Sequence, residues 1–305
     1  MASNKRQKLQ PENGACCECV CHGKSDEDDA AQSNVYKMQL QRYEIFKSQD
    51  GEKGHFDVTF MVGGKKIFAN KHVLASISEP LNTMLSNRWF KNEDSVVEIK
   101  TCHYAGFHQF LCFVYSGKCM VTEENVFQLI DLAQSYDFCI LKNFCDTFLS
   151  NIEYNVRKAY KMLEVSQTYS LKQCTESLKI YVEKNWKEVI DFDKFLLLEK
   201  SSVVLLSSFK RASNEEESFQ NAVFKWAEHQ GLVKQKAKND ESFNLDDAIK
   251  AELTDILPLL LLNNVNAEAT QKFINKHRDW FSASESYQIL RQSKDSKENI
   301  FKAVT

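Results

Sequence analysis

Residues that break regular structure are scarce in this sequence. Its 305 residues include only 9 glycines and 3 prolines. Collagen-like chains, extended low-complexity segments and β-propellers all use these residues heavily, so the composition excludes them. The hydrophobic share of 43% and the charged share of 27% are typical of a globular protein. At roughly 150 residues per domain, the length predicts about two domains, and we expect them to be rich in helix.

Long hydrophobic runs are also lacking. The longest, residues 256–262, is far shorter than the ~20 apolar residues of a membrane-spanning helix. Residues 1–11 lack the apolar core of a secretory signal. We therefore expect a soluble protein of the cytoplasm without a membrane partner, whose ten cysteines are reduced thiols rather than disulfides.

The chain has no excess of positive charge. It carries 39 basic and 42 acidic side chains, a net charge of −3. Binding to a phosphate backbone requires clustered Lys and Arg, so the sequence predicts no direct contact with nucleic acid. The small basic patch in residues 5–8 has two interpretations, a nuclear import signal, which would add the nucleus as a location, and an ordinary solvated patch.

Catalytic motifs are absent as well. The sequence contains no phosphate-binding G-x-x-x-x-G-K-[ST] loop, no G-x-S-x-G elbow and no H-E-x-x-H helix. We therefore expect no enzymatic activity, no cofactor and no metal centre. His108 and Cys112 lie one helical turn apart beside apolar residues, which favours a packed core pair over a pair of metal ligands.

One local cluster of thiols is unusual. Cys16, Cys17, Cys19 and Cys21 are followed by His22. These side chains could chelate a soft ion, but a zinc finger needs two ligand pairs separated by a folding loop. The alternatives are lipidation or redox modification of the cysteines and incidental composition.

Regular structure begins after a polar tail. Residues 1–34 contain almost no large apolar side chain, so we expect them to be disordered. Tyr36, Leu40 and Tyr43 then recur at i, i+4 and i+7, and Phe46 extends the stripe. This spacing predicts a helix over residues 35–47.

The next segments predict a small sheet among helices. Residues 56–62 and 65–69 are rich in β-branched and aromatic residues and flank Gly63-Gly64, which predicts a β-hairpin. Short helices, a strand over residues 96–99 and a helix ending at Gly117 should follow. From Thr122, which resembles a helix N-cap with Asn125, the remaining pattern is nearly all helical.

Four short blocks occur in this order: Asp57-Val58-Thr59, Ala69-Asn70-Lys71-His72-Val73-Leu74-Ala75, Phe113-Val114-Tyr115-Ser116-Gly117 and Leu132-Ala133-Gln134-Ser135-Tyr136. They resemble the D-V-T, A-H-K-x-V-L-A, F-x-Y-T-G and L-A-x-x-Y blocks of the BTB/POZ domain family. The resemblance covers residues 35–149. It implies an α+β domain with a small sheet covered by helices.

The second half resembles another family. It is similar to the BACK domain that often follows BTB. The similarity is carried by residues 169–171 with Cys174, by residues 192–198 and by the block from Glu217 to Trp226. The resemblance covers residues 150–285 and implies an all-helical domain. We expect residues 286–305 to form a polar tail.

The BTB resemblance implies a homodimer. An N-terminal helix whose apolar stripe finds no cover in its own domain is buried by a second copy, with twofold symmetry. The expected interface residues are Tyr36, Leu40, Tyr43 and Phe46, together with Asp57 and Lys71, which match a charged pair beside the dimer cleft in several BTB proteins. The alternatives are that the stripe packs on its own domain and that Asp57 and Lys71 are a solvated surface pair.

The resemblance also implies a surface for a cullin scaffold. In the family it lies between the helix of residues 80–85, the strand of residues 96–99 and the first BACK helices. The expected partner residues here are Met84, Leu85, Trp89, Phe90 and Lys91; the alternative for Trp89 and Phe90 is an ordinary loop packed on its own domain. Lys91 stands where adaptors of the family commonly have glutamate, and Asn70 stands where the family usually has histidine.

The resemblance therefore predicts a non-catalytic protein-interaction protein. It implies a homodimeric substrate adaptor of a cullin-RING ubiquitin ligase, with an unidentified protein substrate. The alternative is a dimerising scaffold or transcription-linked interaction protein without a ligase. Since no kelch or MATH module is evident beside the two domains, we expect substrate recognition to involve the BACK helices or a tail.

Overall fold

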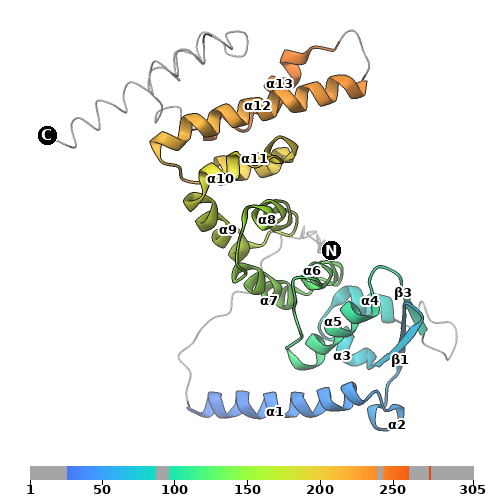
Figure 1. Cartoon of the computed structure of the whole chain (residues 1–305). Helices are drawn as coiled ribbons and strands as arrows, with labels where there is room; N and C mark the ends of the chain where they lie inside the picture. The colour runs from blue at the N-terminus through green and yellow to red at the C-terminus, as the bar shows by residue number, and fades with distance from the viewer. Residues whose placement is uncertain (1–25, 87–95, 239–242, 261–274, 276–305) are drawn as a thin grey trace, which may run out of the picture. The chain divides into compact units, whose positions relative to one another are not determined.

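The computed structural model describes residues 26–86, 96–238, 243–260 and 275 of the chain (Figure 1). Two compact units divide after Cys145, within helix α7 (Cys139–Ser150), and each is described by itself. The expected polar tail at residues 286–305 and the thiol cluster of residues 16–21 lie outside the described residues.

Unit 1 is built on a three-stranded sheet in the order β2-β1-β3. The expected hairpin is confirmed, because β1 (Val58–Val62) pairs antiparallel with β2 (Lys65–Ala69). Gly63 and Gly64 join them with φ values of +54° and +77°, which favour glycine. Strand β3 (Val96–Ile99) pairs parallel with β1.

The sheet packs one face on helices. The side chains of β1 and β2 that alternate toward this face are at most 2% exposed: Val58, Phe60, Val62, Ile67 and Ala69. The ring of Phe60 meets that of Phe107 edge to face, with 5.0 Å between centroids. This apolar layer forms the core of unit 1.

The helices of unit 1 surround this core. They are α1 (Asp26–Ser48), α2 (Gly51–Gly54), α3 (Lys71–Ala75), α4 (Glu79–Leu85), α5 (Tyr104–Ser116) and α6 (Val126–Ser135). Helix α5 packs against α1, α3 and α6. Gly117 ends α5 with a φ of +71°, as the sequence predicts.

The expected contact between Thr122 and Asn125 forms, but in the turn before α6, because the helix begins at Val126 and its N-cap residue Asn125 makes no side-chain capping bond. The backbone N–H of Thr122 donates to the Asn125 Oδ1 at 2.8 Å, and the backbone N–H of Asn125 donates to the Thr122 Oγ1 at 3.3 Å. The two side chains therefore satisfy each other's backbone donors, as in a capping box with asparagine in place of glutamate.

The expected boundary of the disordered tail is wrong. Helix α1 begins at Asp26, so residues 26–34 are helical. Asp28 and Asp29 lie in its first turn, where the positive end of the helix dipole favours acidic residues. Since the later part of α1 packs on α5, further turns extend an existing helix and need no new nucleus.

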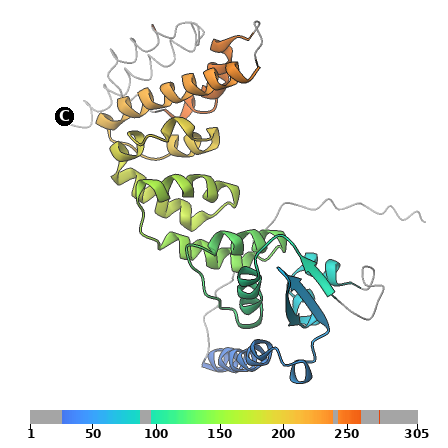
Figure 2. The same cartoon turned by 45° about the vertical axis from the view of Figure 1, so that its right-hand side comes forward.

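The regular structure in the described residues of unit 2 is helical, and Figures 1 and 2 show these helices stacked in chain order. It contains α8 (Val156–Thr168), α9 (Lys172–Lys184), α10 (Trp186–Ile190), η1 (Phe195–Leu197), α11 (Lys200–Ser207), α12 (Ser213–Lys238), α13 (Leu245–Leu253) and η2 (Leu257–Leu259). Helix α8 packs on α9 and α11, whereas α12 packs on α10 and α13. The expected fold class, α+β followed by an all-helical part, is confirmed. Within the described ranges, no helix is both long and apolar enough to cross a bilayer.

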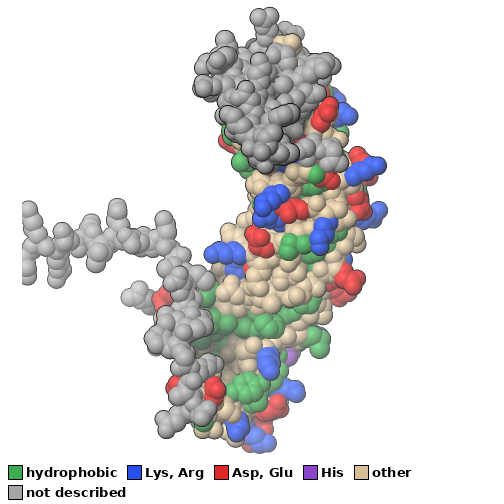
Figure 3. Space-filling model, turned by 90° about the vertical axis from the view of Figure 1, so that its left-hand side faces the viewer, with side chains coloured by type: hydrophobic (Ala, Val, Ile, Leu, Met, Phe, Trp, Pro, Cys, Tyr) green, Lys and Arg blue, Asp and Glu red, His purple; other side chains and the backbone are tan. Residues whose placement is uncertain are grey.

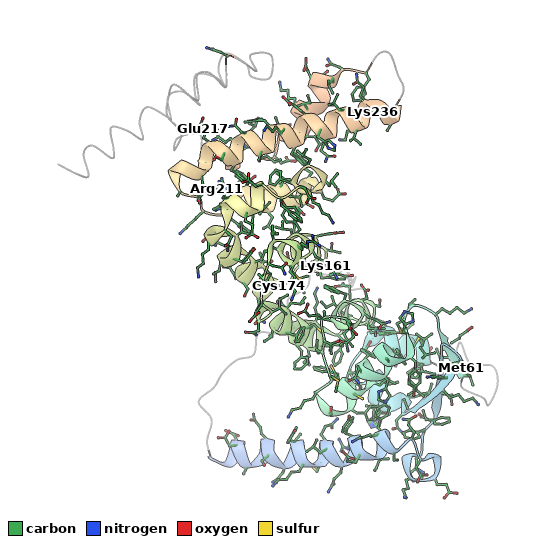
Figure 4. All side chains as sticks on the ribbon, in the orientation of Figure 1. Met61, Lys161, Cys174, Arg211, Glu217 and Lys236 are labelled. Carbon is green, nitrogen blue, oxygen red and sulfur yellow. The ribbon has the colours of Figure 1, made fainter. Side chains whose placement is uncertain are left out.

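A buried ion pair joins the helices of unit 2. Arg211 lies beside the beginning of α12 (Figure 4), and its Nε donates to the Glu216 Oε2 at 2.7 Å. Both side chains are 0% exposed. Because an unpaired charge in such a place is very costly, each of these residues depends on the other.

The same guanidinium satisfies the end of α11. Its Nη1 donates to the carbonyls of Leu206, Ser207 and Phe209 at 2.9–3.1 Å. The carbon of the guanidinium lies 4.3 Å from the ring centroid of Phe219. Arg211 therefore holds the end of α11 against α12 through both hydrogen bonds and a cation–π contact.

Candidate protein-interaction surfaces

The inner face of α1 packs on its own unit. Phe46 is 1% exposed and stacks on Tyr115 with 4.2 Å between ring centroids. The Gln39 Nε2 donates to the carbonyl oxygen of Tyr115 on α5. Phe46 therefore packs within its own unit, and its predicted place at a dimer interface stays a prediction.

The other residues of the predicted stripe also face unit 1 to differing degrees. Leu40 and Tyr43 are half-buried. Burial raises the pKa of Tyr43 to about 12, and a hydrogen bond with Cys112 adds to the shift. Tyr36 is 42% exposed, and its hydroxyl accepts a hydrogen bond from the Lys118 Nζ at 3.0 Å. The part of this stripe nearest Phe46 therefore packs on its own domain.

A different set of side chains forms the exposed apolar face of α1. Val35, Met38 and Ile45 are 61%, 48% and 42% exposed. Their positions, i, i+3 and i+10, lie on one side of a helix. We call these three residues the outer stripe. The outer stripe is not among the predicted interface residues, although its helical spacing is as visible in the sequence as that of the stripe from Tyr36 to Phe46.

Exposed hydrophobic side chains recur elsewhere on the described surface. Figure 3 shows them interspersed with charged side chains. In unit 1, Met120 is 70% exposed and Ile140 is 62% exposed. Single exposed apolar residues are common on globular proteins, so the three aligned residues of the outer stripe carry more information than these two.

Asp57 has a role within unit 1. Its Oδ1 accepts the backbone N–H of Lys71, the first residue of α3, at 2.6 Å. The N-cap residue Asn70 makes no side-chain capping bond to this helix. Asp57 therefore caps α3 from the residue before β1, and its predicted role beside a dimer cleft, like that of Lys71, stays a prediction.

Asn70 lies at a junction of polar contacts. Its backbone N–H donates to the Tyr115 hydroxyl at 2.8 Å, and that hydroxyl donates to the Asn70 Oδ1 at 3.0 Å. Its Nδ2 donates to the carbonyls of Gly54 and His55, both at 3.1 Å. Burial raises the pKa of Tyr115 to about 12. Asparagine thus fixes the link between α2, β2 and α5 at this position.

Removing the Tyr115 hydroxyl should destabilise unit 1. In Tyr115→Phe, Asn70 loses both bonds to the hydroxyl while the ring stack on Phe46 is kept. We expect the free energy of unfolding to fall by about 1–3 kcal/mol, measured by urea denaturation. The matched control is Tyr36→Phe, whose hydroxyl is bonded at the surface, and it should change stability by less than about 0.5 kcal/mol. Equal losses in the two variants would contradict the role given to Asn70 and Tyr115.

Only part of the predicted cullin surface is described. Met84 is half-buried on α4. Leu85 is 4% exposed and belongs to the core of unit 1, and its predicted place on a partner surface stays a prediction. Trp89, Phe90 and Lys91 lie outside the described residues.

The pair of His108 and Cys112 is part of the packing between α1 and α5. Cys112 is 4% exposed, its Sγ lies 3.6 Å from the His108 Nδ1, and the His108 ring stacks against Phe46. Burial lowers the pKa of His108 and raises that of Cys112, because it disfavours both charged forms. In the part of the chain that the structure describes, no three His, Cys, Asp or Glu side chains are grouped as metal ligands.

Comparison with protein families assigns both units. The model of the BTB/POZ domain matches residues 46–153, and the model of the BACK domain (BTB And C-terminal Kelch) matches residues 159–240. The chain is a BTB/POZ protein with a BACK domain. BTB–BACK proteins are protein-interaction proteins of the cullin-adaptor type and are typically not enzymes.

Relatives of this BTB–BACK chain are longer proteins. Human Kelch-like protein 24 is 25% identical over 184 residues, which are 60% of this chain and 30% of the relative. Bovine BTB/POZ domain-containing protein 9 is 25% identical over 211 residues, 67% of this chain and 33% of the relative. The chain thus spans about a third of the length of these curated relatives.

Solved structures of BTB domains are also similar to this BTB–BACK chain. The BTB domain of zebrafish PATZ1 is 22% identical, with a TM-score of 0.33, over 40% of this chain and 95% of that one. The BTB domain of human Gigaxonin is 20% identical, with a TM-score of 0.31, over 43% of this chain and 99% of that one.

Proposed function

We propose that this chain is a non-catalytic, homodimeric adaptor that brings a protein substrate to a cullin-RING ubiquitin ligase. The observation that carries the proposal is the order of the two families in one chain, BTB over residues 46–153 and BACK over residues 159–240. The first domain would supply the dimer and the docking site for the cullin. The second would extend that docking site and hold the substrate.

The outer stripe supports the dimer. Val35, Met38 and Ile45 are exposed although they are aligned on one side of α1. A second copy related by twofold symmetry would cover this stripe with the same stripe or its surroundings. If the whole helix takes part, the interface would reach the homodimer class of roughly 2,000 Å² or more.

The positive charge of Lys91 would weaken the binding of a cullin. Adaptors of the family commonly have a glutamate at the corresponding position, so lysine reverses the sign of one contact. A like-charge mismatch in an interface costs up to several kcal/mol. We therefore propose weak docking by the native surface.

The variant Lys91→Glu should capture a cullin more tightly than the native chain. The full chain would be immobilised and titrated with the purified N-terminal domain of a cullin, and binding would be measured by biolayer interferometry. We expect the variant to lower the dissociation constant by about tenfold or more, because it replaces a repulsive contact by an attractive one.

The matched control is Lys66→Glu, which makes the same charge change at an exposed residue of β2. It should leave the dissociation constant within about twofold of the native value. If neither the native chain nor Lys91→Glu binds the cullin domain, the adaptor proposal fails and the dimerising scaffold becomes the better interpretation.

A further inference from the structure

Unit 2 contains a cavity of about 390 Å³ between two parts of the chain. One wall is the segment from Ile190 to Leu196, between α10 and η1. The other wall is the first half of α12, where the lining residues from Ser218 to Lys225 are spaced i, i+3, i+4 and i+7, on one side of the helix. We call this cavity the α12 groove. Its volume lies in the range of small-ligand and peptide side-chain pockets.

Hydrogen bonds hold the wall of the groove in place. The Trp226 Nε1 donates to the carbonyl of Leu198, and the Gln230 Nε2 donates to the carbonyl of Leu196, both at 2.8 Å. On the other side, the Tyr160 hydroxyl donates to the carbonyl of Val189 at 2.7 Å. The groove is therefore preformed, and a ligand would not have to order it on binding.

The groove combines apolar and charged surface. Ile190, Phe192 and Leu196 line it and are half-buried, so each keeps apolar surface open to a ligand. The Phe192 ring is fixed edge to face against Tyr160, with 4.8 Å between centroids. A side chain entering the groove would thus meet an aromatic surface that is already oriented.

Its charge favours a cationic occupant. Asp191 and Asp193 are exposed on one wall, and Lys225 is exposed on the other. Within the described residues none of these three side chains forms an ion pair. Among the lining residues two carboxylates outweigh one ammonium, since the exposed Lys194 of the same segment does not line the groove. Asp191 directly follows α10, whose terminal carbonyls add partial negative charge.

We propose that the α12 groove binds a segment of a partner protein in which an arginine lies next to an aromatic residue. The planar guanidinium has five donors, so it can bridge Asp191 and Asp193, and it can stack on Phe192. The neighbouring aromatic side chain would cover the apolar surface of Ile190 and Leu196. This binding requires neither a cullin nor a dimer, so its test can fail or succeed independently of the proposed adaptor function.

The probe is a pair of dipeptides that differ only in charge. N-acetyl-arginyl-phenylalaninamide would be titrated into the full chain by NMR, beside the same dipeptide with citrulline, the neutral analogue of arginine. We expect roughly millimolar binding of the arginine dipeptide, because it fills only part of the groove. The citrulline dipeptide should bind at least about tenfold more weakly.

Variants locate the binding site. Asp191→Asn with Asp193→Asn keeps the shape of both side chains and should weaken binding of the arginine dipeptide at least about tenfold. The control Glu199→Gln removes one exposed charge from the same unit outside the groove and should leave the affinity unchanged. Any of three results would overturn the proposal. The two dipeptides could bind equally well, the doubly substituted chain could bind the arginine dipeptide as tightly as the native chain does, or the native chain could show no binding at about 10 mM dipeptide. The dipeptide comparison uses only the native chain, so it does not depend on the folding of a variant.

Discussion

Replacing Arg211 by methionine should lower the free energy of unfolding of unit 2 by about 3–5 kcal/mol, because it leaves Glu216 as a charge buried without its cationic partner. The carbonyls at the end of α11 also lose their donors. The loss would be measured by guanidinium denaturation followed by tryptophan fluorescence, since Trp186 and Trp226 both lie in the core of unit 2.

Two comparisons isolate the buried pair. Lys179→Met removes a surface pair in the same unit, in which the Lys179 Nζ lies 3.8 Å from a Glu176 carboxylate oxygen, and should cost less than about 1 kcal/mol. Adding Glu216→Leu to Arg211→Met should restore part of the lost stability, because it removes the stranded charge. A cost for Arg211→Met as small as that for Lys179→Met would show that the pair does not hold α11 and α12 together.

Met38→Asp should convert the proposed dimer to a monomer. The substitution places a charge among the residues of the outer stripe, and a desolvated charge without a partner is strongly unfavourable in an apolar interface. We expect the dissociation constant of the dimer to rise about 100-fold, an effect of the size seen at interface hot spots. Light scattering at micromolar concentration should then report 35.3 kDa instead of twice that mass.

The control places the same residue on another side of α1. Lys37→Asp introduces aspartate at an exposed position next to Met38 in sequence but about 100° away around the helix. It should leave the mass unchanged. A native chain that is monomeric at micromolar concentration would contradict the dimer itself, and dissociation by both variants would show that the outer stripe is not the contact.

Local features of the fold could be predicted from the sequence. The hairpin at Gly63-Gly64 and the end of α5 at Gly117 depend on residues that accept positive φ. The turn before α6 depends on Thr122 and Asn125, which are three residues apart. In each case the residues that determine the structure are close together in the chain, so the feature can be predicted from a short stretch of sequence alone.

The orientation of α1 could not be predicted in this way. The helix carries two apolar stripes, and the choice between them depends on Tyr115, which packs on Phe46 from a distant part of the chain. Two other contacts also join residues that are separated in sequence. Asp57 caps α3 at Lys71, and the segment from Ile190 to Leu196 lies across the α12 groove from α12. Such contacts are set by tertiary packing, which periodicity alone does not specify.

The parallel pairing of β1 with β3 bears on how the two units fold. Thr59 pairs with Val96, so this sheet closes only after a long loop has been drawn together, whereas α8 with α9 and α12 with α13 meet their neighbours in the chain. Folding rates fall as the mean sequence separation of contacts rises. The helical second unit therefore has the topology of the faster folder, although the ribosome makes it after the first unit.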